Sequence, residues 1–351
     1  MTPRTALKGQ HSSSSQQITT AHTPDEPALD YAVSLVHQIC CLAGSASLID
    51  EVRDDELCAA IDRRDTAAMF DWLVSGLSYQ GISDQIAYDY MERHGRATWQ
   101  DLSAKLSRGA SCPKLSSYWQ FHGCRYEKTS GTCAEPDHFD GCPLPSHRLR
   151  NGRLNQLADS LFFFVRDVAD GDLVGWIDHQ LAAADDPSAP DRIARMTEAV
   201  VGPLRHVYAV ADKVLMMALS CILLGGGAGR PRWLEVGSAM IAVDTLVHNF
   251  LHRTGILARF NADHLYGSAC YRPGRCADII RAIANRIDAR PFNRDFPQPF
   301  PRFVQHAVWQ YCAELGRNVC NGNRLDDRGR CTNIYCQIYS HCDRIQLIIE
   351  A

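Results

Sequence analysis

The 351-residue sequence lacks a long apolar run. Its longest apolar stretch, Val214 to Leu224, is broken by Ser220 and falls well short of the roughly 20 residues that cross a bilayer. Residues 1–27 are rich in Ser, Thr, Gln and His and contain no apolar segment, which is atypical of a signal peptide. We therefore expect no membrane association, an unstructured tail over residues 1–27, and a cytoplasmic protein.

The sequence also lacks an internal repeat and the alternating apolar pattern that is typical of strands. Apolar residues recur at helical spacing instead, as in Phe70, Leu73 and Leu77. This periodicity predicts an all-α protein. We expect helices within residues 28–65, 69–78, 84–95, 154–179, 192–205, 213–224, 244–254, 278–287 and 303–315, and a loop over residues 229–237.

Positive charge is scarce overall but unevenly distributed. The formal net charge is −4. Acidic residues dominate residues 1–200, whereas residues 201–351 are basic and owe this almost entirely to Arg. Arg is the better side chain for holding phosphate groups, so the second half of the chain is the better candidate for contact with an anionic partner.

Cysteine, in contrast, is abundant. Fifteen cysteines in a chain without a recognisable secretion signal favour metal ligation over a disulfide framework. Four of them lie within the last part of the chain with ten, four and five residues between them, as a 4Fe–4S cluster or a tetrahedral zinc ion requires. Free structural thiols are the alternative, and the spacing does not choose between iron and zinc. These residues are Cys320, Cys331, Cys336 and Cys342.

A second group of cysteines falls in residues 111–146, where helical periodicity disappears and Gly, Pro and Ser become frequent. We call this segment the Cys-rich module. Its composition predicts a loop held by a structural zinc ion or a second cluster, with His122, His138 and His147 as competing ligands. The four cysteines are Cys112, Cys124, Cys133 and Cys142. Two further cysteines, Cys270 and Cys276, flank a Pro-Gly turn and are interpreted as ordinary loop cysteines.

One acid stands at a position of special interest. Asp244 precedes an amphipathic segment that runs to Gly255, so it is expected at the positive end of a helix dipole. A carboxylate there either caps the helix or serves a functional role.

The residues around Asp244 carry a resemblance to a known superfamily. Val243-Asp244-Thr245 follows the segment Val-Tyr-Ala-Val-Ala-Asp-Lys-Val of residues 207–214, and Ser78-Tyr79-Gln80 precedes both. With Gly316-Arg317 before the last cysteines, this order resembles the helix-hairpin-helix base-excision DNA glycosylases, which include endonuclease III and the adenine glycosylases. Their hairpin normally reads Leu-Pro-Gly-Val-Gly-x-Lys-Thr. This chain has Tyr208 in place of the proline, and Ala209 and Ala211 in place of the two glycines.

The resemblance implies roles for individual residues. Asp244 would be the carboxylate that supports cleavage of the N-glycosidic bond, and Gln80 would approach the gap left by a flipped base. Lys213 matches the lysine that forms a Schiff base in bifunctional members; a helix lysine that contacts phosphate or solvent is its alternative. The hairpin residues Tyr208, Ala209 and Ala211 and the basic residues Arg317, Arg324, Arg328 and Arg330 would contact DNA.

The resemblance also implies an architecture. We expect a two-lobed helix-hairpin-helix glycosylase fold: one lobe from residues 28–65 and 244–351 with the C-terminal cluster loop, the other from residues 66–243 with the Cys-rich module inserted. A monomer would bind double-stranded DNA between the lobes and remove a damaged or modified base. A non-catalytic relative that binds DNA or a partner, and an unrelated cysteine-ligated metalloprotein, are the alternatives.

Overall fold

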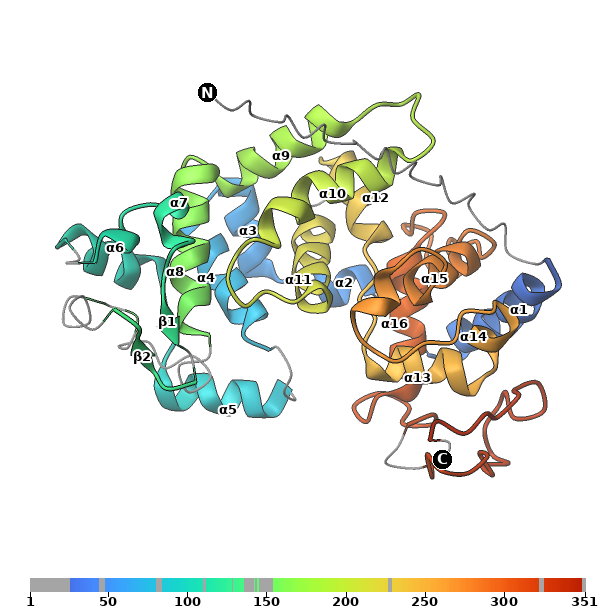
Figure 1. Ribbon diagram of the computed structural model, residues 1–351. Coiled ribbons are helices and arrows are strands. Elements are labelled where there is room, and N and C mark those ends of the chain that lie inside the picture. The colour runs from blue at the N-terminus through green and yellow to red at the C-terminus, as the bar shows by residue number, and fades with distance from the viewer. Residues whose placement is uncertain are drawn as a thin grey trace, which may run out of the picture.

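The computed structural model describes residues 26–43, 48–79, 84–109, 112–127, 129–135, 142, 144, 154–226, 229–321 and 325–348. Almost all regular structure within these ranges is helical (Figure 1). The predicted all-α class is therefore confirmed. The described helices are not long and apolar enough for any of them to cross a membrane.

A first hydrophobic core extends from Leu57 to Met240 and includes the buried side chains of Phe70, Phe163 and Trp233. The elements of this part of the chain are α3 (Asp55–Arg63), α4 (Thr66–Leu77), α5 (Asp84–His94), α6 (Trp99–Ser107), η2 (Pro113–Leu115), α7 (Tyr118–Phe121), β1 (Tyr126–Glu127), β2 (Thr132–Cys133), α8 (Asn155–Phe163), η5 (Phe164–Val168), α9 (Leu173–Ala184), α10 (Arg192–Leu204), α11 (Asp212–Gly225) and α12 (Pro231–Ala239).

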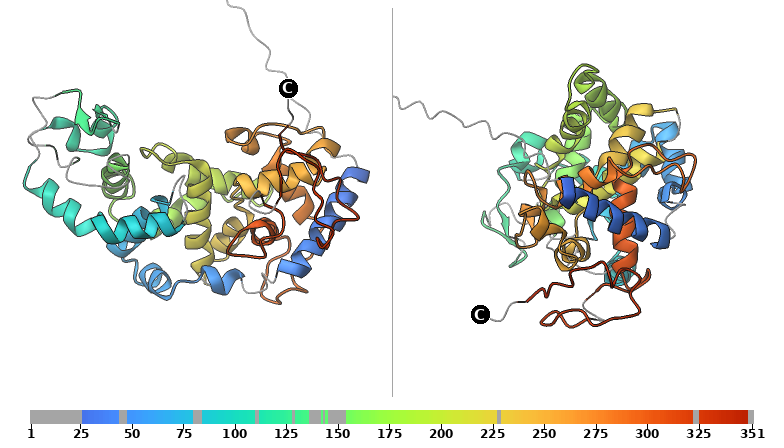
Figure 2. Two further views of the ribbon diagram at one scale, coloured as in Figure 1. Left: turned by 90° about the horizontal axis from the view of Figure 1, so that it is seen from below. Right: turned by 90° about the vertical axis from the view of Figure 1, so that its right-hand side faces the viewer.

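A second core combines the first two helices of the chain with its last third. These elements are α1 (Glu26–Ala43), α2 (Leu48–Val52), α13 (Thr245–Arg253), α14 (Ile256–Arg259), η6 (Ser268–Tyr271), α15 (Cys276–Ala284) and α16 (Pro301–Cys312). Helix α1 packs against α15 and α16, so segments from opposite ends of the sequence lie side by side (Figure 2). The hydroxyl of Tyr31 in α1 secures this contact by donating to the carbonyl of Thr254, with an O···O distance of 2.6 Å.

The chain passes from one core to the other just before Asp244. Met240 belongs to the first core, whereas Ile241 and Val243 belong to the second. Contacts of α11 with α2 and of α12 with α16 join the two halves. Helix α13 therefore begins at the junction of the two cores, and its N-terminus is held from both sides.

Three details differ from the sequence-based expectations. Residues expected to form a loop after Gly229 form α12, because Pro231 suits the first turn of a helix and Trp233 and Val236 face the core one turn apart. Helix α3 packs into the first core, whereas the sequence grouped residues 28–65 with the C-terminal lobe. The Cys-rich module contains short helices and an antiparallel pairing of β1 with β2.

Candidate functional site at the N-terminus of α13

Asp244 caps helix α13. Its backbone is extended, and its carboxylate accepts a hydrogen bond from the backbone N–H of Val247 at 2.9 Å. The preceding residues, Ile241 to Val243, are buried, which fixes the direction from which the chain enters the helix. The carboxylate therefore has a defined orientation at the positive end of the helix dipole.

Lys213 lies near Asp244 although the two are well separated in sequence. It occupies the first turn of α11, and its ammonium interacts electrostatically with the Asp244 carboxylate. Burial raises the pKa of Asp244 above its ordinary value, whereas the Val247 N–H and Lys213 oppose this rise. A carboxylate with a raised pKa beside an amine is typical of sites that transfer protons or activate nucleophiles.

Sequence reasoning missed a buried cation close to this pair. Arg302 of α16 is 6% exposed, and its guanidinium contacts the side chain of Gln305. Burial lowers its pKa, whereas the neighbouring Tyr271 and Asp244 raise it. Its Nε has no hydrogen-bond partner among the described residues. Arg302 therefore contributes positive charge near Asp244 from inside the protein.

The segment before Lys213 forms a tight turn between two helices. Helix α10 ends at Leu204 and α11 begins at Asp212. Between them, Ala209 adopts a left-handed conformation with φ = 60°, and this region of backbone space favours glycine. Ala209 is the residue that stands at the first glycine of the hairpin pattern. The turn between α10 and α11 thus places a left-handed residue at Ala209, where the hairpin pattern has a glycine.

The other candidate DNA contacts have different surroundings. Tyr208 points toward the Cys-rich module, since its hydroxyl donates to the His122 carbonyl at 2.8 Å and its ring lies against Phe121. Ala209 and Ala211 are exposed, and so is Arg317. Gln80 and Arg324 lie outside the described residues.

The last four cysteines line one cavity, whose empty volume of about 300 Å³ includes its opening to solvent. We call residues 320–342 the four-cysteine loop. Two sulfurs accept from the backbone N–H two residues further on, Cys336 from Ile338 and Cys342 from Arg344, and N–H donors of this kind favour thiolates. Arg253 and Arg344 also line the cavity, and each keeps one buried nitrogen without a hydrogen-bond partner among the described residues.

The Cys-rich module brings its four cysteines together as well. Cys124 and Cys142 both interact electrostatically with Cys112, and Cys124 also with Cys133. The same N–H pattern recurs here, because Tyr126, Glu135 and Leu144 donate to the sulfurs two residues before them. His122 is exposed and packs edge-on against the Tyr118 ring. His138 and His147 lie outside the described residues.

A further group gathers ligands that the sequence did not connect. His248, His264, Cys270 and Cys276 place their ligand atoms within 4.8 Å of one another, so they could hold a metal ion. We call them the His/Cys group. Cys270 and Cys276, interpreted from the sequence as ordinary loop cysteines, thus have two histidines beside them as possible co-ligands. The Cys-x₅-Cys spacing was the available signal, but the histidines come from α13 and from the loop after α14.

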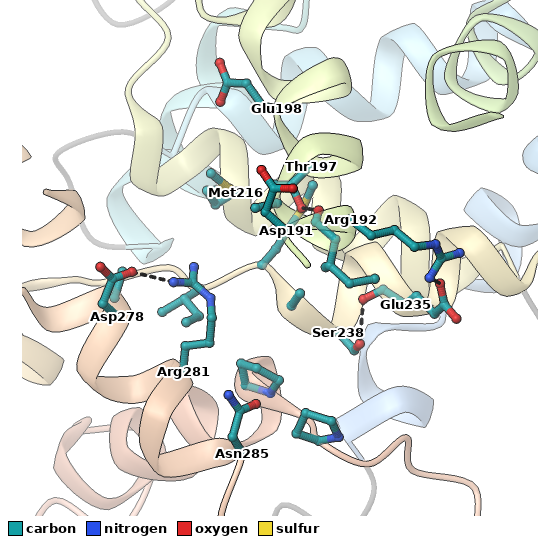
Figure 3. Close-up of a pocket in the computed structure, with 18 of the residues that line it drawn as sticks. Asp191, Arg192, Thr197, Glu198, Met216, Glu235, Ser238, Asp278, Arg281 and Asn285 are labelled. Carbon is teal, nitrogen blue, oxygen red and sulfur yellow. Dashed lines mark hydrogen bonds and ion pairs between the residues drawn. The ribbon is translucent and has the colours of Figure 1, made fainter. Parts of the chain in front are cut away.

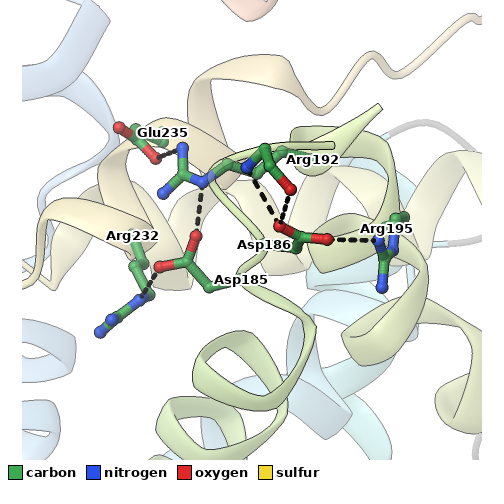
Figure 4. A network of polar contacts seen from close by, with 7 residues as sticks. Asp185, Asp186, Arg192, Arg195, Arg232 and Glu235 are labelled. Carbon is green, nitrogen blue, oxygen red and sulfur yellow. Dashed lines mark hydrogen bonds and ion pairs between the residues drawn. The ribbon is translucent and has the colours of Figure 1, made fainter. Parts of the chain in front are cut away.

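A large cavity lies between α10 and α12 on one side and α15 on the other, with an empty volume of about 1,790 Å³ that includes its opening to solvent (Figure 3). Its arginines are already neutralised. Arg281 pairs with Asp278, and Arg192 takes part in a network with Asp185 and Glu235 (Figure 4). Neither Asp244 nor Lys213 is among its described lining residues. The cavity therefore offers little free positive charge for a phosphate chain.

Comparisons of this chain with models of protein families, with curated proteins and with solved structures gave no match.

Proposed function

We propose that this protein is a DNA glycosylase that removes a damaged or modified base from double-stranded DNA. One observation carries the proposal: a capped, partly buried carboxylate, Asp244, lies beside the hairpin-helix amine of Lys213 where the two cores meet. The resemblance in sequence and the left-handed turn at Ala209 support the same conclusion.

The chemistry explains why a fixed carboxylate is needed. A base inside a duplex cannot be reached, so the enzyme flips the nucleotide out of the stack. The C1′–N bond then breaks: the base leaves with the bonding electrons, positive charge develops on the sugar, and water adds to C1′ with loss of a proton. Ionised Asp244 would stabilise that charge and accept the proton, as carboxylates do in glycoside hydrolysis.

Lys213 gives the site a second possible outcome. A neutral amine at this position would attack C1′ in place of water, displace the base and, by opening of the sugar ring, form a Schiff base. Strand cleavage would follow from that intermediate. If Lys213 stays protonated, it contacts phosphate and the enzyme is a simple glycosylase.

The four-cysteine loop fits a 4Fe–4S cluster on two observations. Four sulfurs line one cavity together with the buried Arg253 and the partly buried Arg344, each of which keeps one nitrogen without a hydrogen-bond partner among the described residues. This lining suits a group that carries net negative charge with its thiolates. Cys320, Cys331, Cys336 and Cys342 would hold the cluster, with zinc as the alternative. When bound, the cluster would order the loop that carries the exposed Arg328 and that begins shortly after the exposed Arg317. Both arginines are free of ion pairs within the described ranges. We propose both as phosphate contacts.

In the Cys-rich module, the proposed group is a structural zinc ion or a second cluster. The recurring N–H donors to sulfur in Cys124, Cys133 and Cys142 support metal ligation there. Tyr208 links this module to the hairpin, so ligation would also stabilise the turn that precedes Lys213.

The test is base excision by Asp244→Asn. Asn keeps the helix cap, so the fold and DNA binding are expected to persist while excision falls by about 100-fold to 1,000-fold. The assay uses duplexes that carry a panel of modified bases, followed by alkali to reveal abasic sites and by borohydride to trap a Lys213 adduct. Asp278→Asn, an exposed acid of α15 that pairs with Arg281, is the matched control and should retain activity.

Two results would overturn the proposal. Salt-sensitive DNA binding by wild-type protein without an abasic product would identify a non-catalytic DNA-binding protein. A reducible chromophore without DNA affinity would identify a metalloprotein of another class.

A further inference from the structure

We propose that the His/Cys group binds a single zinc ion and that this ion fixes the segment between α14 and α15 against the N-terminus of α13. His248 comes from α13, His264 from the loop after α14, Cys270 from η6, and Cys276 from the first turn of α15. One ion would therefore tie together four pieces of chain.

The distances agree with tetrahedral coordination. His248 Nδ1 lies 3.4 Å from Cys276 Sγ and 3.6 Å from Cys270 Sγ, and His264 Nε2 lies 3.4 Å from Cys276 Sγ. Zn–S bonds of about 2.3 Å and Zn–N bonds of about 2.0–2.1 Å in tetrahedral geometry place N and S ligands about 3.6 Å apart. The protein side chains are thus already arranged around a position for one ion.

The orientation of one histidine provides a second, independent indication. His264 Nδ1 lies 2.6 Å from the carbonyl of Ala262, which requires that Nδ1 carry the proton. Nε2 then presents its lone pair toward Cys276. This arrangement, in which one ring nitrogen donates to a backbone carbonyl and the other ligates, is common for metal-bound histidine.

The ligand set favours zinc in a structural role. Two thiolates and two neutral imidazoles balance the charge of a divalent ion, and Zn²⁺ takes such sets with four protein ligands and no open position. Three of the four ligand residues are buried and the fourth is partly buried. The four ligand atoms lie too close together to enclose a cubane cluster, which separates this group from the four-cysteine loop.

The segment that the ion would hold contacts both neighbours of Asp244. The Tyr271 hydroxyl accepts from the backbone N–H of Val243 at 2.9 Å, and the Tyr266 side chain hydrogen-bonds to Thr245. Tyr266 also lies against the His248 ring, with a centroid distance of 5.9 Å. Zinc would thereby position the Asp244 backbone without touching its carboxylate. This part of the inference rests on the proposed function.

Metal content is the primary test, and it does not depend on activity. The purified full-length protein is assayed for zinc and iron per chain by plasma emission spectroscopy. We expect His248→Ala to lose one equivalent of zinc and no iron, and His248→Cys to retain that equivalent, because a third thiolate replaces the imidazole. His252→Ala is the matched control: His252 lies one turn further along α13 and faces Asp263, so zinc should be unchanged.

Cobalt provides a second measurement on protein whose fold is verified by circular dichroism. Protein stripped with a chelator and refilled with Co²⁺ should show the visible bands of tetrahedral cobalt and thiolate charge-transfer absorption. In Cys276→Ser, the intensity of both signals should decrease by the amount that one bound Co²⁺ ion contributes. A Cys270–Cys276 disulfide with no metal, or equal zinc in wild type and a folded His248→Ala variant, would overturn the zinc site.

Activity then tests the positioning role separately. A folded His248→Ala variant should bind DNA but excise the base about 100-fold more slowly, because small misplacements of a catalytic group have effects of this size, and His248→Cys should restore the rate. If the folded His248→Ala variant loses zinc but excises the base at the full rate, the positioning role is refuted, whereas the proposed zinc site still holds. If wild-type protein excises no base, the proposed function fails, but the metal measurements still decide the zinc site.

Discussion

The two ends of helix α13 face different collections of cysteines. At the first turns, His248 meets two cysteines and a second histidine within 4.8 Å. At the last turn, Arg253 borders a cavity of about 300 Å³ lined by four cysteines. A nine-residue helix thus connects the compact His/Cys group at its first turns with the four-cysteine loop at its last turn. We call the four-cysteine loop the wide group, and the end of α13 beside it the wide end.

The charges around the two groups differ in a way that indicates what each can hold. Two thiolates, two imidazoles and a divalent ion are electrically neutral, so the His/Cys group requires no additional cation. Four thiolates around a zinc ion or a 4Fe–4S cluster leave net negative charge, and burying such charge requires compensation. At the wide end Arg344, which has no ion pair among the described residues, lines the cavity, and Arg253, although paired with Asp327, interacts electrostatically with the Cys320 thiol.

The largest expected effect is on the wide group. Cys331→Ser removes one of four ligands, so we expect the protein to lose its iron, or its zinc if that is the metal, from the four-cysteine loop. Ligand binding contributes directly to the folding free energy of such loops, so the melting temperature of the C-terminal part should drop. Metal analysis and calorimetry measure both.

In the same protein, zinc at the His/Cys group should persist, since its ligands lie on different segments. Cys40→Ser is the control, because Cys40 is a buried thiol in α1 outside either group. Simultaneous loss of both metals in folded Cys331→Ser would show that the two ends of α13 are not independent.

The next effect concerns the charge at the wide end. Arg253 is 2% exposed and donates to Asp327 at 2.6 Å. We expect Arg253→Met to destabilise the protein by about 1–3 kcal/mol, because it leaves the partly exposed Asp327 carboxylate without its hydrogen-bond partner and removes a cation beside Cys320. Denaturant unfolding and metal content provide the measurements.

The control for this change is Arg286→Met, which removes an exposed ion pair with Glu26. Exposed pairs contribute only about 0–1 kcal/mol, so the control should be nearly neutral. Equal stability losses in the two variants would contradict the charge argument.

The sequence allowed part of this site to be predicted, for reasons that differ from one residue to the next. Asp244 was recognisable because a helix cap and the helix that it starts are adjacent in sequence. The cysteines of the four-cysteine loop were visible because a short loop must take its ligands from nearby positions. In both cases local sequence contains the necessary information.

The His/Cys group and Arg302 could not be found in the same way. His248 and Cys276 belong to different helices, and only the packing of α13 and α15 around the intervening loop places them together. Arg302 was not distinguishable from the other arginines of residues 201–351, because the burial of a charge depends on tertiary structure. Helix α12 was missed because Gly229 before it, Pro231 at its start and Gly237 within it are residues typical of loops, although Pro is favourable in the first turn of a helix.

A smaller effect tests the electrostatics at the N-terminal end of α13. In the proposed function Asp244 acts as an ionised carboxylate. Burial raises its pKa while Lys213 lowers it, and Arg302 and Tyr266 also face it. As pH falls through that raised pKa, Asp244 is protonated and excision declines. We expect Lys213→Met to move this acid limb to higher pH, as measured by the rate of base release.

A stability measurement gives the same information if base release by the variant is too slow. A raised folded pKa means that the contribution of Asp244 to stability is present at low pH and is lost as pH rises through that pKa. Wild type should therefore lose stability relative to Asp244→Asn as pH rises, and in the Lys213→Met background the loss should continue to higher pH and be larger, because only the folded pKa has risen. Identical curves in the two backgrounds would show that Lys213 does not face the carboxylate.

The smallest predicted effect concerns the turn that delivers Lys213 to the site. Ala209 has φ = 60° and is exposed, so glycine at this position should relieve a left-handed conformation without removing a buried contact. We expect Ala209→Gly to stabilise the protein by up to about 1 kcal/mol, the net of the relieved strain and the greater freedom of glycine in the unfolded chain. Val210→Gly, at the neighbouring residue without a positive φ, should destabilise it.

If the hairpin approaches a DNA backbone, removal of the Ala209 methyl group should also strengthen salt-sensitive binding to duplex DNA, as measured by fluorescence anisotropy. If Ala209→Gly raises the free energy of unfolding but leaves the DNA affinity unchanged, the turn positions Lys213 and is not part of the DNA-binding surface.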